Sequence, residues 1–266
     1  MTPDPSSARL SALLAPMARV AVAVSGGVDS LTLLAFAARH HPEVSAFHAQ
    51  SAAVPPEATA RTRALAASLD VRLELIDAGE LADPRYRENP VDRCYTCKSH
   101  LYDAIAAAPR THDAVVLSGT NRDDLGDFRP GLRAADERAV RHPFAEAGMG
   151  KAEIRALARA LGLGHLAELP AQPCLASRVE TGVAIDASLL RAIHDVETRA
   201  RRQVGEGAVV RCRVRAGRTE LELDEATLAR VDLTALRAAL AEAALPVSAV
   251  VPYRMGSAFL RVLESA

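Results

Sequence analysis

A short apolar run that leads through a glycine-containing turn into a helical pattern sets the fold class of this chain. Residues 19–24 read Arg-Val-Ala-Val-Ala-Val and are almost continuously apolar, as a strand buried on both faces of a parallel sheet should be. The turn Ser-Gly-Gly-Val-Asp-Ser follows at residues 25–30, and a helical pattern extends over residues 28–39. A strand that feeds a helix in this way predicts a right-handed β-α-β unit.

The alternation continues and predicts a doubly wound parallel α/β sheet. We expect further strands over residues 44–49, 71–76 and 114–117. We expect further helices over residues 55–68, 96–107 and 151–161. In such a sheet helices cover both faces.

The pattern changes after about residue 184 and predicts a small C-terminal α+β domain. Asp186 is placed to cap a long helix that extends to about Gln203. Two alternating stretches joined at Ala216-Gly217, a further helix and two short strands complete the chain. We therefore predict a first domain over residues 1–184 and a second, for substrate binding and oligomerisation, over residues 185–266. The irregular stretch 170–181 is the expected segment between them.

Charge and hydropathy exclude several classes of function. The formal net charge of the 266 residues is -1, so the chain offers no basic field for a nucleic acid backbone. No apolar run reaches the roughly 18 residues of a membrane span, and the N-terminus lacks a signal-peptide pattern. We therefore expect a cytoplasmic protein that binds neither nucleic acid nor membrane.

The turn at residues 25–30 has the composition of a phosphate-binding loop. Gly26 and Gly27 let backbone N–H groups approach phosphate oxygens, and the start of the following helix adds positive potential. Ser25 and Ser30 add hydroxyl donors, while Asp29 suits a Mg²⁺ ion that bridges phosphates. The turn lacks the Gly-Lys-Ser/Thr ending of a Walker loop. All six residues fit a phosphate-binding loop and directly follow the first predicted strand, which disfavours the alternative of an ordinary glycine turn with a serine cap.

These six residues resemble the PP-loop of ATP pyrophosphatases, a family that includes GMP synthetase, NAD synthetase, asparagine synthetase and several tRNA-thiolating enzymes. The resemblance implies an adenine nucleotide alpha hydrolase-like domain that cleaves ATP between its α- and β-phosphates. The loop would hold the leaving pyrophosphate, and a carboxylate or amide oxygen of the substrate would receive AMP.

The cysteines indicate a second chemical centre. Cys94 and Cys97 form a C-x-x-C motif before a predicted helix, and Cys174 lies in the irregular segment. Three such thiolates can hold a metal centre with one position open for chemistry. A structural zinc site, a thioredoxin-like redox pair and simple burial remain as alternatives. Cys212 alternates with Val210 on a strand, so we expect it in the core.

The same strand carries basic side chains on its other face. They are Arg211, Arg213 and Arg215. A row of guanidinium groups can hold a phosphate bidentately. The alternative is cross-strand pairing with the acidic face of the next strand. That face is formed by Glu220, Glu222 and Asp224.

Six motifs in a fixed order carry a closer resemblance. After the loop come R-C-Y-x-C-K, G-T-N-x-x-D-x-x-x-x-R-P-G, K-A-E-I-R, P-C-L-A-S-R and Y-R-x-G-S. Together they resemble the LarE family, the sulfur insertases of nickel-pincer cofactor biosynthesis for lactate racemase, over nearly the whole chain. The resemblance implies that pyridinium-3,5-biscarboxylic acid mononucleotide is adenylated on a carboxylate, which becomes a thiocarboxylate, and that the cycle is repeated on the second one.

The resemblance also implies roles for particular residues. The ATP site would include Gly119, Thr120, Asn121 and Asp124. Ser177 and Arg178 would lie beside the sulfur site at Cys174, and the mononucleotide phosphate would be held by Arg213, Arg215 and Arg254. The sequence departs from the family where the usual R-x-H-x-G is Arg-Val-Arg-Ala-Gly at residues 213–217, and it contains no tryptophan.

The family has two sulfur sources. In one type the cysteine of P-C-L-A-S-R loses its own sulfur and becomes dehydroalanine. In the other, that cysteine and the C-x-x-C pair bind a four-iron four-sulfur cluster. All three cysteines are present here, so the chain is similar to the cluster type. The resemblance implies a homo-oligomer, with a hexamer as the candidate. The alternatives are a PP-loop enzyme of tRNA thiolation and a regulator that binds an adenine nucleotide without catalysis.

Overall fold

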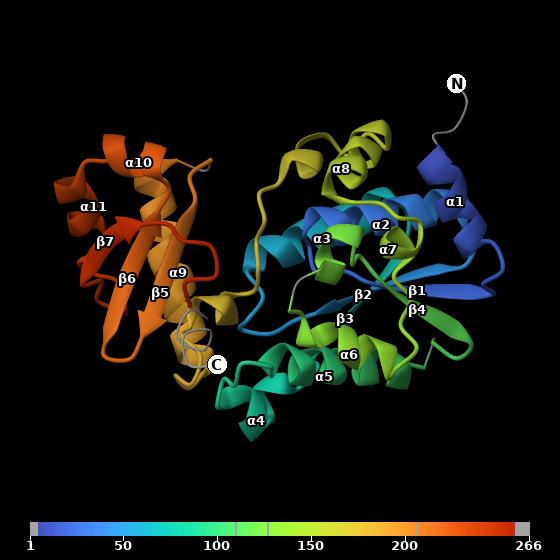
Figure 1. Ribbon diagram of the computed structural model, residues 1–266, viewed down its shortest axis with the longest axis horizontal. Coiled ribbons are helices and arrows are strands. Elements are labelled where there is room, and N and C mark those ends of the chain that lie inside the picture. The colour runs from blue at the N-terminus through green and yellow to red at the C-terminus, as the bar shows by residue number, and fades with distance from the viewer. Residues whose placement is uncertain (1–4, 110, 127, 206, 259–266) are drawn as a thin grey trace. The chain divides into compact units, whose positions relative to one another are not determined.

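The computed structural model describes residues 5–109, 111–126, 128–205 and 207–258 (Figure 1). The chain divides into two compact units. One comprises Met1–Glu80 and Cys94–Gln172, and the other comprises Leu81–Arg93 and Pro173–Ala266. The stretch 173–184, assigned to the first domain in the sequence analysis, therefore groups with the second unit.

The first unit is built on a four-stranded sheet of order β3-β2-β1-β4. Its strands are β1 (Arg19–Ala23), β2 (Val44–Ala49), β3 (Arg72–Ile76) and β4 (Ala114–Ser118). All three pairings are parallel, and Val22 in the centre is opposite both Ala46 and Leu117. After β1 the chain adds β2 and β3 on one side and returns to place β4 on the other. This reversal beside β1 is where open α/β sheets bind ligands, at the carboxyl ends of the strands.

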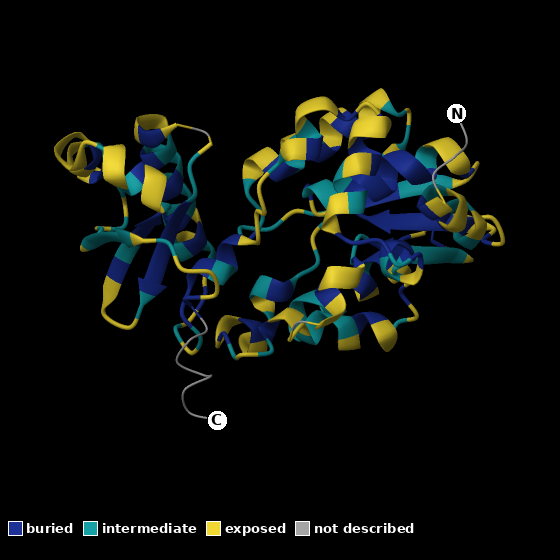
Figure 2. Ribbon diagram, turned by 45° about the horizontal axis from the view of Figure 1, so that its top comes forward, coloured by how far each residue is buried: buried dark blue, intermediate teal, exposed yellow. Residues whose placement is uncertain are grey.

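Helices cover both faces of this sheet (Figure 1). One layer contains α1 (Pro5–Leu14), α2 (Val28–His40), α3 (Pro56–Ser68) and α8 (Lys151–Ala160), and the other contains α5 (Arg93–Ala107) and α6 (Pro130–Asp136). Val20 and Val22 pack in the first layer, whereas Ala21 packs with Tyr102 and Ile105 of α5 in the second. Figure 2 shows the buried strands between the layers. The predicted doubly wound sheet is confirmed.

Several short elements were not predicted, because they are too short to carry a period. They are α4 (Pro84–Arg87), α7 (Pro143–Glu146), η1 (Glu80–Ala82), η2 (Arg122–Gly126), η3 (Gly164–Glu168) and η4 (Leu175–Arg178). The start of α5 also differs from the prediction, which placed it at residue 96. The helix begins at Arg93, whose N–H donates to the Pro90 carbonyl at 3.1 Å, so the C-x-x-C motif lies within its first turns.

The second unit is a small α+β fold, as expected. Its sheet has the order β5-β6-β7, antiparallel between β5 (Val210–Arg215) and β6 (Arg218–Leu223) and parallel between β6 and β7 (Ala249–Pro252). Its helices are α9 (Ala187–Val204), α10 (Glu225–Arg230) and α11 (Leu233–Leu240). The Asp186 side chain accepts from the N–H groups of Ser188 and Leu189, which confirms it as the cap of α9. Of the two closing strands expected, β7 is described, and residues 259–266 lie outside the described part.

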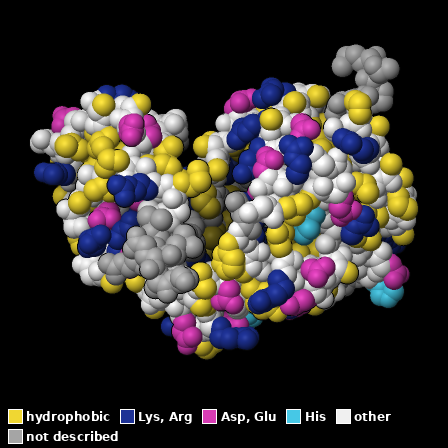
Figure 3. Space-filling view, in the orientation of Figure 1, with side chains coloured by type: hydrophobic (Ala, Val, Ile, Leu, Met, Phe, Trp, Pro, Cys, Tyr) yellow, Lys and Arg dark blue, Asp and Glu magenta, His cyan; other side chains and the backbone are white. Residues whose placement is uncertain are grey.

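None of the described helices is long and apolar enough to cross a membrane. On the face of the molecule shown in Figure 3, basic and acidic side chains are interspersed among apolar ones.

Candidate active site

Two serines brace the loop at the end of β1. The Ser25 N–H donates to Ser30 Oγ at 3.0 Å, and the Ser30 hydroxyl donates to the Gly27 carbonyl at 3.0 Å. The N-cap of α2 is Gly27, which has no side chain to accept from the first N–H groups of this helix. Free N–H groups at a helix start are suited to a phosphate.

Two glycines allow other elements to approach the loop closely. Gly26 has φ +80°, and a Cβ atom there would lie 2.6 Å from the carbonyl oxygen of Ala58 in α3. At Gly119, after β4, a Cβ atom would lie 2.8 Å from the backbone nitrogen of Ser30. These missing side chains bring α3 and the end of β4 against the phosphate loop, from positions far away in the sequence.

The residues after β4 reach Asp29. Asn121, which is fully buried, donates from Nδ2 to Asp29 Oδ2 at 3.1 Å. Its own N–H donates to Asp124 Oδ2 at 3.2 Å, so Asp124 orients the segment from behind. Thr120 is half-buried, with its hydroxyl 3.0 Å from that of Ser118. The predicted ATP-site residues of β1 and β4 therefore converge at one sheet edge.

Asp29 has an unsatisfied oxygen. Its Oδ1 is buried and has no hydrogen-bond partner among the described residues. Burial raises the pKa of the carboxyl, although the Asn121 hydrogen bond opposes this. A buried carboxylate oxygen without a donor is costly unless a cation satisfies it. Carboxylate oxygens are ligands that Mg²⁺ prefers. The residue set at this edge therefore fits a magnesium ion beside the phosphates, with Asp29 as the protein ligand.

Lys151 joins this group although the sequence analysis did not assign it to the site. It is the first residue of α8, and its Nζ lies 3.8 Å from Asp124 Oδ1. Burial raises the pKa of Asp29, and the charge of Lys151 partly opposes this rise. A lysine at the sheet edge offers a cation to the nucleotide. The sequence offered a signal for Lys151, because all basic residues except Lys98 and Lys151 are arginines or histidines.

A buried histidine supports the backbone just before the loop. His48 of β2 is 1% exposed; its Nδ1 lies 2.7 Å from the Val24 carbonyl and its Nε2 lies 2.8 Å from the Thr59 hydroxyl in α3. A carbonyl only accepts, so Nδ1 carries the proton. Burial lowers the pKa of His48, which keeps the ring neutral.

The four cysteines differ in their surroundings. Cys94 and Cys174 are exposed, Cys97 is partly buried, and Cys212 is buried. Burial strongly raises the pKa of the Cys212 thiol, and its prediction as a core residue is confirmed. Cys94 and Cys97 belong to the first unit and Cys174 to the second. Within the described ranges, no three His, Cys, Asp or Glu side chains are grouped to hold a metal ion.

Arg178 holds the backbone that carries Cys174. The guanidinium is 2% exposed, and its Nη1 donates to the carbonyls of Pro173 at 2.6 Å and Cys174 at 3.2 Å and to Ser177 Oγ at 3.1 Å. Its Nε and Nη2 donate to the two oxygens of Glu197. The donors of this side chain are therefore directed at protein atoms, and Arg178 fixes the backbone on both sides of the Cys174 peptide unit.

Glu197 anchors this arrangement from α9, and the sequence analysis did not assign it. Its oxygens also accept from Arg201 at 2.8 Å and from the Cys212 N–H at 3.0 Å, and it is 1% exposed. A third guanidinium is close by: burial and the charge of Arg178 lower the pKa of Arg211 to about 10. A signal existed, because Glu197 interrupts the apolar stripe of α9 at a core position.

The arginines assigned to the mononucleotide phosphate have different partners. Arg213 pairs with Glu222 at 2.8 Å, both nearly inaccessible, and Arg215 pairs with Glu220 at 2.7 Å. The cross-strand pairs proposed as the alternative are thus present. Arg215 also borders a surface cavity of about 390 Å³ at the turn between β5 and β6. Arg254 is exposed, and its role, like that of the other two, stays a prediction.

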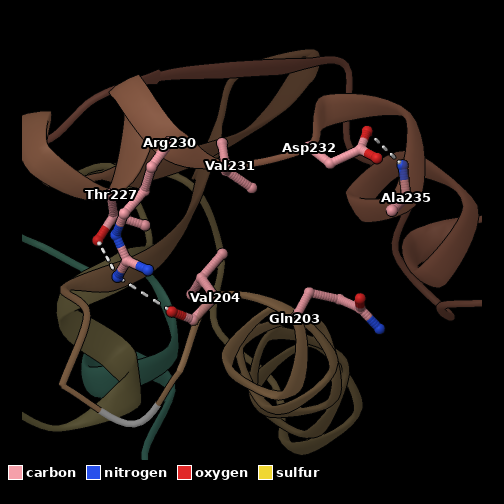
Figure 4. Close-up of a pocket in the computed structure, with 7 residues that line it drawn as sticks. All are labelled: Gln203, Val204, Thr227, Arg230, Val231, Asp232 and Ala235. Atoms are coloured by element: carbon pink, nitrogen blue, oxygen red, sulfur yellow. Dashed lines mark hydrogen bonds between the residues drawn. The ribbon is translucent and has the colours of Figure 1, made fainter.

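A smaller cavity of about 100 Å³ lies between the end of α9 and α10 (Figure 4). Arg230 extends along its wall and donates to the Val204 carbonyl at 3.2 Å. Sites for small molecules enclose about 300–1,000 Å³, so this cavity is too small for a nucleotide.

The fold and the loop together define a class of protein. A parallel sheet with this loop at its switch point, and a carboxylate beside it, belongs to an ATP-using PP-loop enzyme. The chain is a member of the asparagine synthase family, which it matches over residues 13–229.

Three individual proteins are similar to the chain. The chain is 38% identical over 206 residues to the protein slr1717 of Synechocystis sp., covering 76% of each chain. It is 34% identical over 159 residues to the pyridinium-3,5-bisthiocarboxylic acid mononucleotide synthase of Lactiplantibacillus plantarum, covering 59% of this chain and 58% of that protein. It is 29% identical over 192 residues to MJ0830 of Methanocaldococcus jannaschii, covering 72% of each. The predicted resemblance to the LarE family is thereby confirmed.

Proposed function

We propose that the protein is an ATP-dependent sulfur transferase that adenylates a carboxylate of pyridinium-3,5-biscarboxylic acid mononucleotide and converts it to a thiocarboxylate. The observation that carries the proposal is the convergence of Asp29, Asn121 and Asp124 on the phosphate loop at the switch point of the sheet. The similarity to the L. plantarum synthase supports the choice of substrate.

The adenylation step follows from the residues at this edge. The N–H groups at the start of α2 and the loop hydroxyls would bind the pyrophosphate as it leaves. Asp29 would hold Mg²⁺, whose charge offsets that of the phosphates, and Asn121 would orient Asp29. The substrate carboxylate attacks the α-phosphorus, the bond to the bridging oxygen breaks, and pyrophosphate leaves.

Asp29→Asn tests this step. The variant should lose pyrophosphate release with the mononucleotide present and still fold, because asparagine keeps the size of the side chain and an oxygen that can accept from Asn121. Asp136→Asn is the matched control, since Asp136 is an exposed carboxylate in α6, away from the loop. Wild-type pyrophosphate release in Asp29→Asn would remove Asp29 from the mechanism.

For the sulfur source we propose the cluster type. Cys94 and Cys97 are one turn apart at the start of α5, where the positive helix end favours thiolates. Cys94, Cys97 and Cys174 would supply the three thiolates of a four-iron four-sulfur cluster, and none of the three is buried. Such a cluster, when bound, supplies a sulfide at its open iron. Arg178 keeps the Cys174 backbone in place, and Ser177 would contact the substrate beside it.

Cys94→Ala separates this source from a sacrificial cysteine. In the sacrificial route the Cys174 thiolate attacks the acyl-adenylate carbonyl and AMP leaves. Loss of the Cys174 α-proton then breaks its Cβ–S bond and leaves dehydroalanine. Cys94 has no part in that route. After anaerobic purification, Cys94→Ala should lose both iron and activity; full single-turnover activity with dehydroalanine at position 174 by mass spectrometry contradicts the cluster.

The proposal extends to the substrate phosphate and to assembly. Of the three arginines assigned to the substrate phosphate, Arg254 is the exposed one. To bind the phosphate, Arg213 and Arg215 would have to give up their present glutamate partners. We also propose a homo-oligomer, with a hexamer as the candidate, which light scattering after size-exclusion chromatography tests.

A further inference from the structure

Arg61 lies on the flank of the phosphate loop, and no sequence motif includes it. Helix α3 packs so closely on the loop that Gly26 has no space for a Cβ atom beside Ala58. Arg61 is three residues further along α3, and residues three apart share a face of a helix. Its Nε donates to the Gly26 carbonyl oxygen at 3.2 Å, so its guanidinium contacts the loop itself.

The charge of Arg61 has little compensation within the protein. Its second hydrogen bond, from Nη2, is to the amide oxygen of Gln172 at 2.7 Å, at the surface. Among the described residues no carboxylate forms an ion pair with it; Glu57, one turn earlier, attracts it, but this effect on the pKa of Arg61 is smaller than that of burial. Desolvation lowers the pKa of Arg61, which indicates a cation held partly out of water. A half-buried guanidinium on two neutral oxygens favours an anion from outside the chain.

We propose that Arg61 is a binding residue for the nucleotide's phosphates, on the α3 side of the loop. This inference rests on the ATP site of the proposed function. Arg61 would keep its contact to Gly26 through Nε and present its Nη atoms to a phosphate oxygen. Hydrogen bonds to a charged acceptor are roughly twice as strong as those to a neutral one, so the phosphate displaces the Gln172 amide.

The arrangement gives Arg61 a role that Asp29 and Lys151 do not have. Asp29 and Lys151 contact the residues after β4, on one side of β1. Arg61 comes from α3, which follows β2 on the other side. The phosphates would therefore be held from both sides of the switch point.

Binding measurements on matched ligands test the proposal. Mg²⁺-ATP, inorganic pyrophosphate and adenosine are titrated into the wild type and into Arg61→Ala, Arg61→Lys and Arg63→Ala. Arg63 is exposed on the same helix, so Arg63→Ala makes the same charge change without the loop contact. Arg61→Ala should weaken ATP and pyrophosphate about 10- to 100-fold and leave adenosine unchanged. Arg61→Lys should lose less, because it keeps the charge but not the planar fork. Arg63→Ala should bind all three ligands like the wild type.

Two results would overturn the assignment. If Arg61→Ala weakens ATP and adenosine equally, Arg61 only supports the Gly26 backbone. If ATP and pyrophosphate bind unchanged, the guanidinium is not a phosphate ligand. Arg61→Lys and the circular dichroism of each variant guard against misfolding. A wild type that binds neither ATP nor pyrophosphate refutes the ATP site as well, whereas a wild type that binds ATP but transfers no sulfur refutes only the proposed reaction.

Discussion

Replacing Glu197 with Gln should destabilise the second unit strongly. The Glu197 carboxylate accepts four hydrogen bonds, two of them from Arg178, and is 1% exposed. The amide removes the negative charge and turns an NH₂ group toward these donors. Arg178, which is 2% exposed, and its neighbours Arg201 and Arg211 are then left without the carboxylate that attracts them.

The magnitude follows from the burial of the pair. Breaking a buried ion pair by neutralising one partner costs about 3–5 kcal/mol, because the other charge stays desolvated. That is a large part of the roughly 5–15 kcal/mol that stabilises a typical domain. A surface carboxylate behaves differently, and exposed Glu242 is the matched control, for which Glu242→Gln should change stability by less than about 0.5 kcal/mol.

Urea unfolding followed by far-UV circular dichroism at pH 7.5 measures the difference. Hydrogen exchange provides a local readout, because Arg178 also donates to the carbonyls of Pro173 and Cys174. Exchange over residues 173–178 should accelerate in Glu197→Gln and not in Glu242→Gln. A loss below about 1 kcal/mol with unchanged exchange would show that the network neither stabilises the unit nor holds the Cys174 segment.

Three further outcomes are expected. Gly119→Ala places a Cβ atom 2.8 Å from the Ser30 nitrogen, so the free energy of unfolding in urea should fall by about 1–3 kcal/mol and ATP binding should weaken. Unchanged stability and unchanged ATP affinity would contradict the close approach. Burial lowers the pKa of His48 below its ordinary 6.5, so the folded state binds fewer protons than the unfolded state. Its contribution to stability should be complete above pH 6.5 and decline as the pH falls toward the folded-state pKa; a slope between pH 7.5 and 5.5 that is the same in His48→Gln would exclude this histidine. Arg213→Ala leaves Glu222 buried without its main partner and should cost about 3 kcal/mol; a raised KM for the mononucleotide at unchanged stability would instead assign Arg213 to the substrate phosphate.

Local patterns were sufficient for the sheet and for the loop. The apolar run of β1, the glycine turn and the helical periodicity of α2 all occur within 22 consecutive residues, from Arg19 to His40. Strand and helix signals of this kind depend on neighbours in the chain, so they can be recognised from the sequence. The cap of α9 at Asp186 was predictable for the same reason.

The conformation of the segment before the C-x-x-C motif is set by tertiary contacts and could not be predicted from the sequence. Residues 81–93 group with the second unit, where the Asn89 side chain donates to the carbonyls of Glu180 at 2.8 Å and Val183 at 2.9 Å. Asn89 has φ 55°, a conformation that asparagine tolerates better than most residues. Its partners are more than 90 residues away in the chain, so no local pattern indicates them.

The sequence by itself determined the class of fold and the phosphate loop, because periodicity and turn chemistry depend on residues that are neighbours in the chain. Only the tertiary structure decided the partners of the charged side chains. Arg61 donates a hydrogen bond to Gln172, which is 111 residues further along the chain, and Arg178 donates to Glu197 of α9. A charged residue reads as solvent-facing in a sequence, and its burial depends on which distant groups satisfy it. The fold supplies those groups, and with them the roles of these residues.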